Sequence, residues 1–130
     1  MSFLLDTNIC SAHLRNPAGL THRMLQYSGR LFTSEIVVAE LYAGAFHKAL
    51  SGPLLTGIDD FLTDIRVLPF DRACALSFGQ IRGEQLRRGI SFSPIDLMIA
   101  ATAFAHDLTV VTHNVKDFDK IPDLRIEDWL

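Results

Sequence analysis

The chain of 130 residues is too short for two ordinary domains, and its content of 48% hydrophobic and 21% charged residues excludes a disordered polypeptide. Its apolar runs fall well below the roughly 20 residues that cross a bilayer, and its first residues lack the basic start of a signal peptide. A net charge of −3 argues against a protein that binds nucleic acid by a broad basic face alone. We therefore expect one domain over residues 1–130, located in the cytoplasm.

Short apolar runs alternate with segments of helical periodicity along the whole chain. The expected elements, in chain order, are a strand at 3–5, helices at 9–15 and 20–27, a strand at 31–33, helices from 35 to about 50 and over 54–65, a strand at 67–68, helices over about 72–88 and from 94 to about 106, a strand at 109–112, and an edge strand over 124–129. This alternation predicts an α/β fold with a parallel sheet.

Several residues mark the ends of these helices. Ser34 and Asp71 stand where N-caps are expected, and Ser93-Pro94 is typical of the start of a helix. Gly52-Pro53 is expected to break the chain between two helices.

The helix after Asp71 is expected to bury one face, at Cys74, Phe78, Ile81 and Leu86. The two cysteines of the chain, Cys10 and Cys74, show no spacing typical of a metal site, so we expect reduced, buried thiols.

Three acidic residues lie where a parallel sheet binds ligands, beyond the carboxyl ends of its strands. Asp6 directly follows the first strand, Glu40 has uncharged helical neighbours, and Asp96 stands in the first turn of a strongly apolar helix. Each has a simpler explanation, because Asp6 and Asp96 fit helix-capping roles and Glu40 could reach the rim of the sheet or pair with an arginine.

The segment after the last central strand adds Asn114 and Asp117, which also suit turns. Together the acids predict a cluster whose mutual repulsion raises the carboxylate pKa values or requires a cation. Oxygen ligands favour a hard ion, Mg²⁺ or Mn²⁺, and such an ion can bridge an acidic protein to phosphate.

Five segments, in order along nearly the whole chain, resemble the PIN-domain family and, within it, the VapC-type toxins of toxin-antitoxin pairs. They are LLDTN at 4–8, SEIVVAELYAGA at 34–45, LPFD at 68–71, IRGEQLRRGISFSPIDLMIAATA at 81–103, and VVTHNVKDF at 110–118. The resemblance implies an α/β/α sandwich around a short parallel sheet and a metal-dependent endoribonuclease. It also implies a homodimer and a small antitoxin protein whose C-terminal segment occupies the active-site groove.

By this resemblance, Asp6, Glu40 and Asp96 match the three principal acids of the family. The fourth acidic position is open, because Asn114 stands where many PIN domains carry an aspartate and Asp117 follows nearby.

Thr7, Asn8 and Thr112 are similar to the hydroxyl and amide residues that support the acids in this family.

We expect Asp6 and Asp96 to hold Mg²⁺ most directly, with Glu40 and Asp117 positioning bound waters. Glu40 is the expected general base because its surroundings are apolar.

Two other functions are compatible with acids gathered at one edge of a parallel sheet. A non-catalytic dimerising module would keep the fold and use the acids only for stability. A Mg²⁺-binding phospho-acceptor domain would need an aspartate at the end of one strand and a lysine at the end of another, whereas Leu68-Pro69 and Thr112-His113 stand at those positions.

Overall fold

The computed structural model describes residues 1–49 and 51–130. Its elements are β1 (Phe3–Leu5), α1 (Thr7–Arg15), the 3₁₀ helix η1 (Pro17–Gly19), α2 (Thr21–Gln26), β2 (Leu31–Ser34), α3 (Glu35–His47), α4 (Ser51–Leu62), β3 (Arg66–Leu68), α5 (Arg72–Arg87), α6 (Pro94–Ala105), β4 (Thr109–Val111), α7 (Val115–Phe118) and β5 (Ile126–Glu127). The strands and main helices expected from the sequence are present, whereas η1 and α7 were not predicted. Leu50, where the third helix was expected to end, lies outside the described residues.

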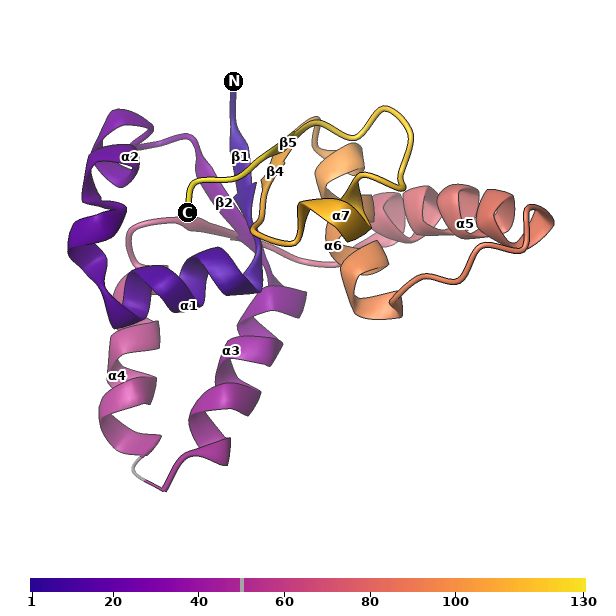
Figure 1. Ribbon diagram of the computed structural model, residues 1–130. Helices are drawn as coiled ribbons and strands as arrows, with labels where there is room; N and C mark the ends of the chain where they lie inside the picture. Colours follow the sequence, from indigo (N-terminus) through magenta and orange to yellow (C-terminus); the bar gives the residue numbers. More distant parts are fainter. Residues whose placement is uncertain (50) are drawn as a thin grey trace.

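The five strands form one parallel sheet in the order β3-β2-β1-β4-β5. Figure 1 shows α1 and α2 on one side of this sheet and α5, α6 and α7 on the other, which gives the expected three-layer α/β/α arrangement. The chain moves outward from β1 in both directions, so the neighbouring ends of β1 and β4 form the switch point at which such sheets bind ligands.

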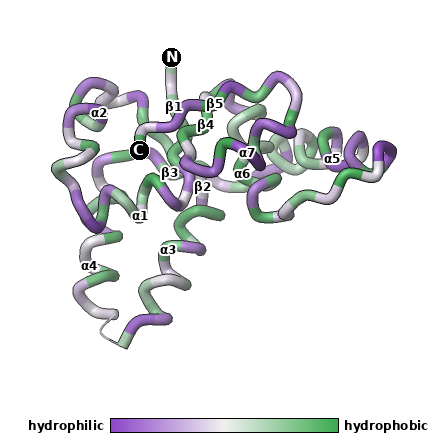
Figure 2. Tube along the Cα trace, viewed as in Figure 1, coloured by the Kyte–Doolittle hydropathy of each residue, from purple (hydrophilic) through white to green (hydrophobic). Residues whose placement is uncertain are grey.

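The central strands are buried on both faces, as a parallel sheet between helices requires. Every residue of β1 and β4 is buried, and α6 contributes six buried residues to the same core. Figure 2 shows these hydrophobic segments gathered at the centre of the molecule. A sheet held this firmly gives the residues after its strands fixed positions.

The predicted helix caps are confirmed. The Ser34 hydroxyl accepts a hydrogen bond from the Ile36 amide at 3.0 Å, and the Asp71 carboxylate accepts one from the Cys74 amide at 3.1 Å. The Ser93 hydroxyl accepts a hydrogen bond from the backbone amide three residues further on, at 3.3 Å. These contacts fix the starts of α3, α5 and α6.

Two predictions about helices were wrong. Gly52-Pro53 does not separate two helices but lies in the first turn of α4. Proline is tolerated there because the N–H that it lacks would have no partner within the helix. Leu86 is not inward, since 62% of it is exposed. Gln85 is buried in its place, because the stripe that continues Phe78 and Ile81 at helical spacing reaches residue 85.

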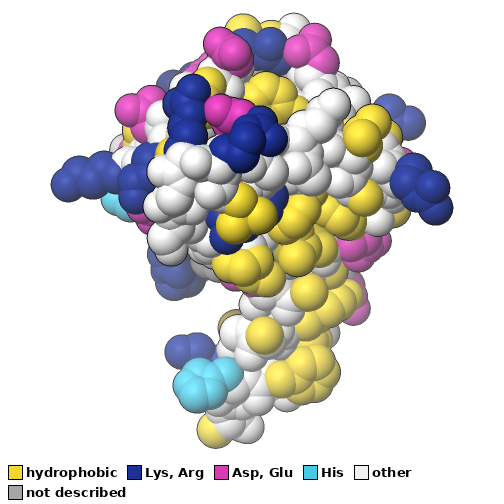
Figure 3. Space-filling view, turned by 90° about the vertical axis from the view of Figure 1, so that its right-hand side faces the viewer, with side chains coloured by type: hydrophobic (Ala, Val, Ile, Leu, Met, Phe, Trp, Pro, Cys, Tyr) yellow, Lys and Arg dark blue, Asp and Glu magenta, His cyan; other side chains and the backbone are white. Residues whose placement is uncertain are grey.

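Helices α3 and α4 pack together and extend away from the sheet as an arm (Figure 1). Hydrophobic side chains are exposed along this arm in Figure 3, which views the molecule from the right-hand side of Figure 1. Phe46, near the end of α3, is 67% exposed. Within residues 1–49 and 51–130, no helix has the length and apolar character needed to cross a membrane.

Candidate active site

Asp6 lies at the centre of the site, at the point where β1 ends and α1 begins. Its Oδ1 accepts a hydrogen bond from the Thr7 amide and its Oδ2 accepts one from the Thr112 hydroxyl, both at 2.8 Å. Only 4% of Asp6 is exposed. Burial raises the pKa of Asp6, and the nearby charge of Glu40 adds to this effect, whereas the hydrogen bonds from Thr112 and Thr7 oppose it. Asp6 therefore caps α1, as the sequence predicts.

Glu40 reaches the same cavity from α3. It is half-buried, and the Thr7 hydroxyl donates a hydrogen bond to its Oε1. Thr7 thus connects two acids, because its amide bonds Asp6 and its hydroxyl bonds Glu40. The partner of Glu40 is a neutral hydroxyl, so its negative charge is not cancelled by this contact.

Asp96 approaches from the first turn of α6. Burial, reinforced by the charges of three neighbouring carboxylates, raises the pKa of Asp96 to about 6. Those neighbours are Asp6, Glu40 and Asp117. The structure therefore brings together the acids from β1, α3 and α6, and their mutual repulsion disfavours the fully ionised cluster.

The two residues proposed for the fourth position lie in different places. Asn114 faces the same cavity as Asp6, Glu40 and Asp96. Asp117 lines an adjoining cavity that also includes Asp96, and its Oδ1 lies 3.6 Å from Lys120 Nζ. Asp117 is thus near enough to act on Asp96 electrostatically but stands at the edge of the cluster.

A hydrogen-bond network connects the residues that follow β4 to Asp6 and Asn8. The buried Thr112 hydroxyl donates to Asp6 and accepts a hydrogen bond from the Asn114 amide at 2.9 Å. Asn8 Nδ2 lies 3.4 Å from the same hydroxyl, and Asn8 Oδ1 accepts from the His113 amide at 3.0 Å. Thr112 therefore orients the Asp6 carboxylate through Oδ2. Asn8 connects α1 to the loop after β4.

These residues enclose an open cavity of about 370 Å³. It is lined by Asp6, Thr7, Asn8, Ser11, Arg15, Glu40, Asp96 and Asn114. Sequence reasoning missed Ser11 and Arg15. Both follow Thr7 at intervals of four residues along α1, so helical periodicity could have placed them on the same face.

The donor atoms of this cavity suit a hard divalent cation. The carboxylate, amide and hydroxyl groups around it offer oxygen, and neither sulfur nor imidazole lines it among the described residues. Burial raises the pKa of Asp96, and the neighbouring carboxylates of Asp6, Glu40 and Asp117 add to this effect. A divalent cation held by Asp6 and Asp96, with Glu40 nearby, would relieve this repulsion.

Residues 3–124 match the family model of the PIN domain. The chain belongs to the PIN-domain family. The tRNA(fMet)-specific endonuclease VapC of Salmonella typhimurium is 37% identical over 130 residues, which cover 99% of this chain and 98% of that protein. Ribonuclease VapC2 of Rickettsia felis is 32% identical over 132 residues, with the same coverage of the two chains.

Solved structures agree with this PIN-domain assignment. The crystal structure of DNA-bound VapBC from Salmonella typhimurium contains a chain that matches with a TM-score of 0.94 at 37% identity, covering 100% of this chain and 99% of that one. The VapBC2 structure from Rickettsia felis, bound to a promoter DNA fragment, matches with a TM-score of 0.93 at 30% identity and covers both chains completely. The predicted fold and the resemblance to VapC-type PIN proteins are confirmed.

Proposed function

We propose that this PIN-domain protein is an Mg²⁺-dependent endoribonuclease and the toxin of a toxin-antitoxin pair, acting in the cytoplasm as a single nuclease domain. The observation that carries the proposal is the convergence of Asp6, Glu40 and Asp96 on one cavity at the switch point of the sheet. Relatives that cover nearly the whole chain carry the names tRNA(fMet)-specific endonuclease and ribonuclease. These names support RNA as the substrate class.

Mg²⁺, with Mn²⁺ as a substitute, is the proposed cofactor because the available ligands are oxygen atoms of carboxylate groups. Asp6 and Asp96 would hold the ion, and Glu40 and Asp117 would position waters around it. When bound, the cation supplies positive charge against the phosphate and lowers the pKa of a coordinated water.

Glu40 is the proposed general base. Its Oε1 is engaged by the Thr7 hydroxyl, so Oε2 is the oxygen that can take a proton from the water that attacks phosphorus. The hydrogen bond from Thr7 fixes the direction of the carboxylate. Asn114 and Ser11 can orient substrate oxygens from the cavity wall, and the hydrogen bonds to Asp6 keep its oxygens in place.

The proposal is tested by RNA cleavage with purified protein and Mg²⁺. Glu40→Gln and Asp96→Asn should each lower kcat by about 100-fold or more, in the range found when a general base or a charge-stabilising group is removed. Glu35→Gln on the same helix and Asp123→Asn are matched controls, because both acids are exposed and lie outside the cavity.

Retention of full activity by both site variants would overturn the proposal. A folded wild-type protein that binds its partner but cleaves no RNA with either metal would instead favour the non-catalytic interaction module. EDTA should abolish cleavage, and added Mg²⁺ or Mn²⁺ should restore it.

We further propose a homodimer and a small antitoxin that covers the active-site groove. The neighbouring structures are VapBC assemblies by their descriptions, which supports a protein partner. The exposed hydrophobic side chains of the α3–α4 arm, including Phe46, support burial of this surface in an assembly.

A further inference from the structure

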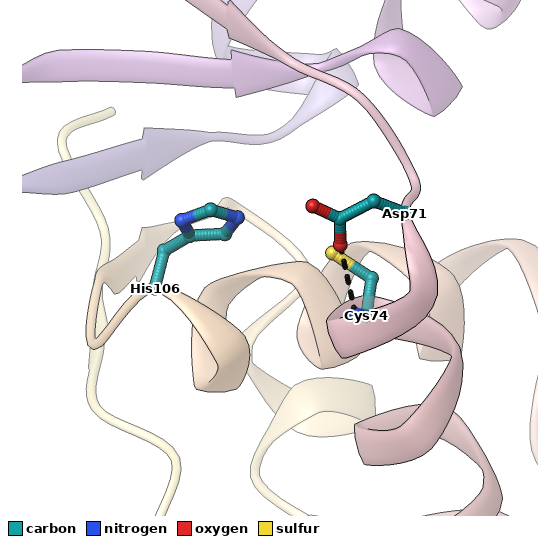
Figure 4. Close-up of side chains that lie close together, drawn as sticks. All are labelled: Asp71, Cys74 and His106. Atoms are coloured by element: carbon teal, nitrogen blue, oxygen red, sulfur yellow. Dashed lines mark hydrogen bonds between the residues drawn. The ribbon is translucent and has the colours of Figure 1, made fainter.

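Three potential metal ligands meet at a second place, away from the acid cavity. Asp71 caps the start of α5, Cys74 lies in its first turn, and His106 follows the end of α6. One ligand atom from each residue lies within 4.8 Å of the other two. Figure 4 shows the three side chains directed toward a common space. The sequence spacing of cysteines and histidines gives no sign of this cluster, because His106 lies 32 positions after Cys74.

The cluster consists of one buried and two exposed residues. The Cys74 residue is fully buried, and its Sγ lies 3.7 Å from the Pro69 carbonyl oxygen, whereas Asp71 and His106 are exposed. Asp71 Oδ1 accepts the hydrogen bond that caps α5, which leaves Oδ2 for another partner. The exposed carboxylate and imidazole therefore stand beside the buried thiol.

The combination of sulfur, imidazole nitrogen and carboxylate oxygen favours Zn²⁺ over Mg²⁺. Zinc ligands at about 2.0–2.3 Å in a tetrahedron lie about 3.3–3.8 Å from one another, so side chains now within 4.8 Å need to close by about 1 Å. We propose that Asp71, Cys74 and His106 form a Zn²⁺ site, with water as the fourth ligand. This set differs in kind from the oxygen ligands of the acid cavity.

Binding at this site exchanges a proton for the metal. Burial raises the pKa of the Cys74 thiol, and the charge of Asp71 adds to this effect, so the metal-free thiol is protonated. Its proton passes to solvent when sulfur coordinates Zn²⁺. Asp71 is ready to bind as a carboxylate, because its hydrogen bond from the Cys74 amide lowers its pKa. The two anionic ligands then balance the charge of the ion.

The ion would clamp the start of α5 to the end of α6. These two helices pack against each other. Asp96 lies in the first turn of α6, and the step of ten residues from Asp96 to His106 corresponds to about 15 Å at a rise of about 1.5 Å per residue. The second site therefore shares no ligand with the acid cavity, and its role would be to stabilise the helix that carries Asp96.

Co²⁺ is the probe, because coordination by a thiolate gives an absorption band that oxygen ligands do not produce. Metal-free protein should develop this band to saturation at one Co²⁺ per chain, and Zn²⁺ should displace it. Cys74→Ser should abolish the band, and His106→Gln should weaken binding at least about tenfold, as loss of a group around a metal site commonly does. Cys10→Ala and His22→Gln are the matched controls and should keep the band.

Zn²⁺ should also raise the Tm of the wild-type protein by more than it raises that of His106→Gln. His106 is exposed, so His106→Gln tests the proposal even if Cys74→Ser does not fold. The proposal would be overturned if the wild-type protein showed no thiolate absorption band after addition of one Co²⁺ per chain. Binding to His106→Gln with wild-type affinity would do the same. None of these readouts depends on RNA cleavage, so failure here is distinct from failure of the nuclease proposal.

Discussion

Replacement of Asp96 by asparagine should stabilise the metal-free protein while it removes activity. The folded protein holds this carboxyl beside three other acids, and its pKa is raised from 3.8 to about 6. An acid whose pKa is raised by folding destabilises the folded state once the group is ionised. Asparagine has nearly the same shape without the charge, so the variant escapes this cost.

The size of the effect follows from the shift in pKa. A shift of about two units corresponds to about 3 kcal/mol at about 1.4 kcal/mol per unit. Asp96 is half-exposed, so screening by water reduces this to about 1–2 kcal/mol. The negative charge also interacts favourably with the N-terminus of α6, worth about 0.3–1 kcal/mol. The net gain for Asp96→Asn at pH 7 is therefore about 1 kcal/mol, or about 3–5 °C in Tm for a chain of this length.

The pH dependence gives the sign of the effect. Below the unfolded pKa near 3.8, Asp96 is protonated in both states and the variant should gain nothing. The gain should develop as the pH rises from about 4 to 6 and persist at neutral pH. Thermal unfolding in EDTA at pH 3.5, 5 and 7 measures this directly, with Asp123→Asn as the exposed control. Added Mg²⁺ should raise the Tm of the wild type more than that of the variant.

Two results would refute this reasoning. A variant that is less stable than wild type at pH 7 would mean that Asp96 is not under repulsion in the folded protein. An equal gain at all three pH values would mean that the gain comes from packing or hydrogen bonding rather than charge.

Three further predictions concern Thr112, the cationic side chains of the two cavities, and Phe46 on the α3–α4 arm. Thr112→Val should lower the free energy of unfolding by about 1–3 kcal/mol in a denaturant titration, because it removes the hydrogen-bond donor of Oδ2 on the buried Asp6 carboxylate; an unchanged midpoint would contradict the role given to Thr112. Arg15→Gln and Lys120→Gln should each raise KM for RNA and reduce the salt dependence of KM, while kcat changes little. The reason is that the Arg15 and Lys120 side chains line the two adjoining cavities. An effect on kcat alone would contradict contact with the substrate. Phe46→Ser should weaken self-association or antitoxin binding in sedimentation experiments without loss of Tm, and unaltered assembly would exclude this part of the arm from the interface.

Much of the fold could be predicted because its signals are local. The apolar run before Asp6 and the caps at Ser34 and Ser93 each lie within a few residues of the element that they define. Gly52-Pro53 was misinterpreted because proline and glycine mark loops in general, whereas the first turn of a helix also accepts them. The prediction for Leu86 was wrong because helical phase, and not residue type, decides which face of α5 is buried.

The arrangement of the acids was predictable for a topological reason. Residues that follow parallel strands meet at one edge of the sheet, which applies directly to Asp6 and to the loop containing Asn114. The difference between Asn114 inside the cavity and Asp117 at its edge depends on the turn of α7, which no sequence pattern specified. The meeting of Cys74 with His106 likewise depends on how α5 packs on α6, a contact between distant parts of the chain.

The most direct measurement of the central claim is the anomalous diffraction of crystals grown with Mn²⁺. We expect a manganese peak within coordination distance of both the Asp6 and Asp96 carboxylates, and no such peak in crystals of Asp96→Asn. Full manganese occupancy elsewhere, with these two carboxylates uncoordinated, would contradict it.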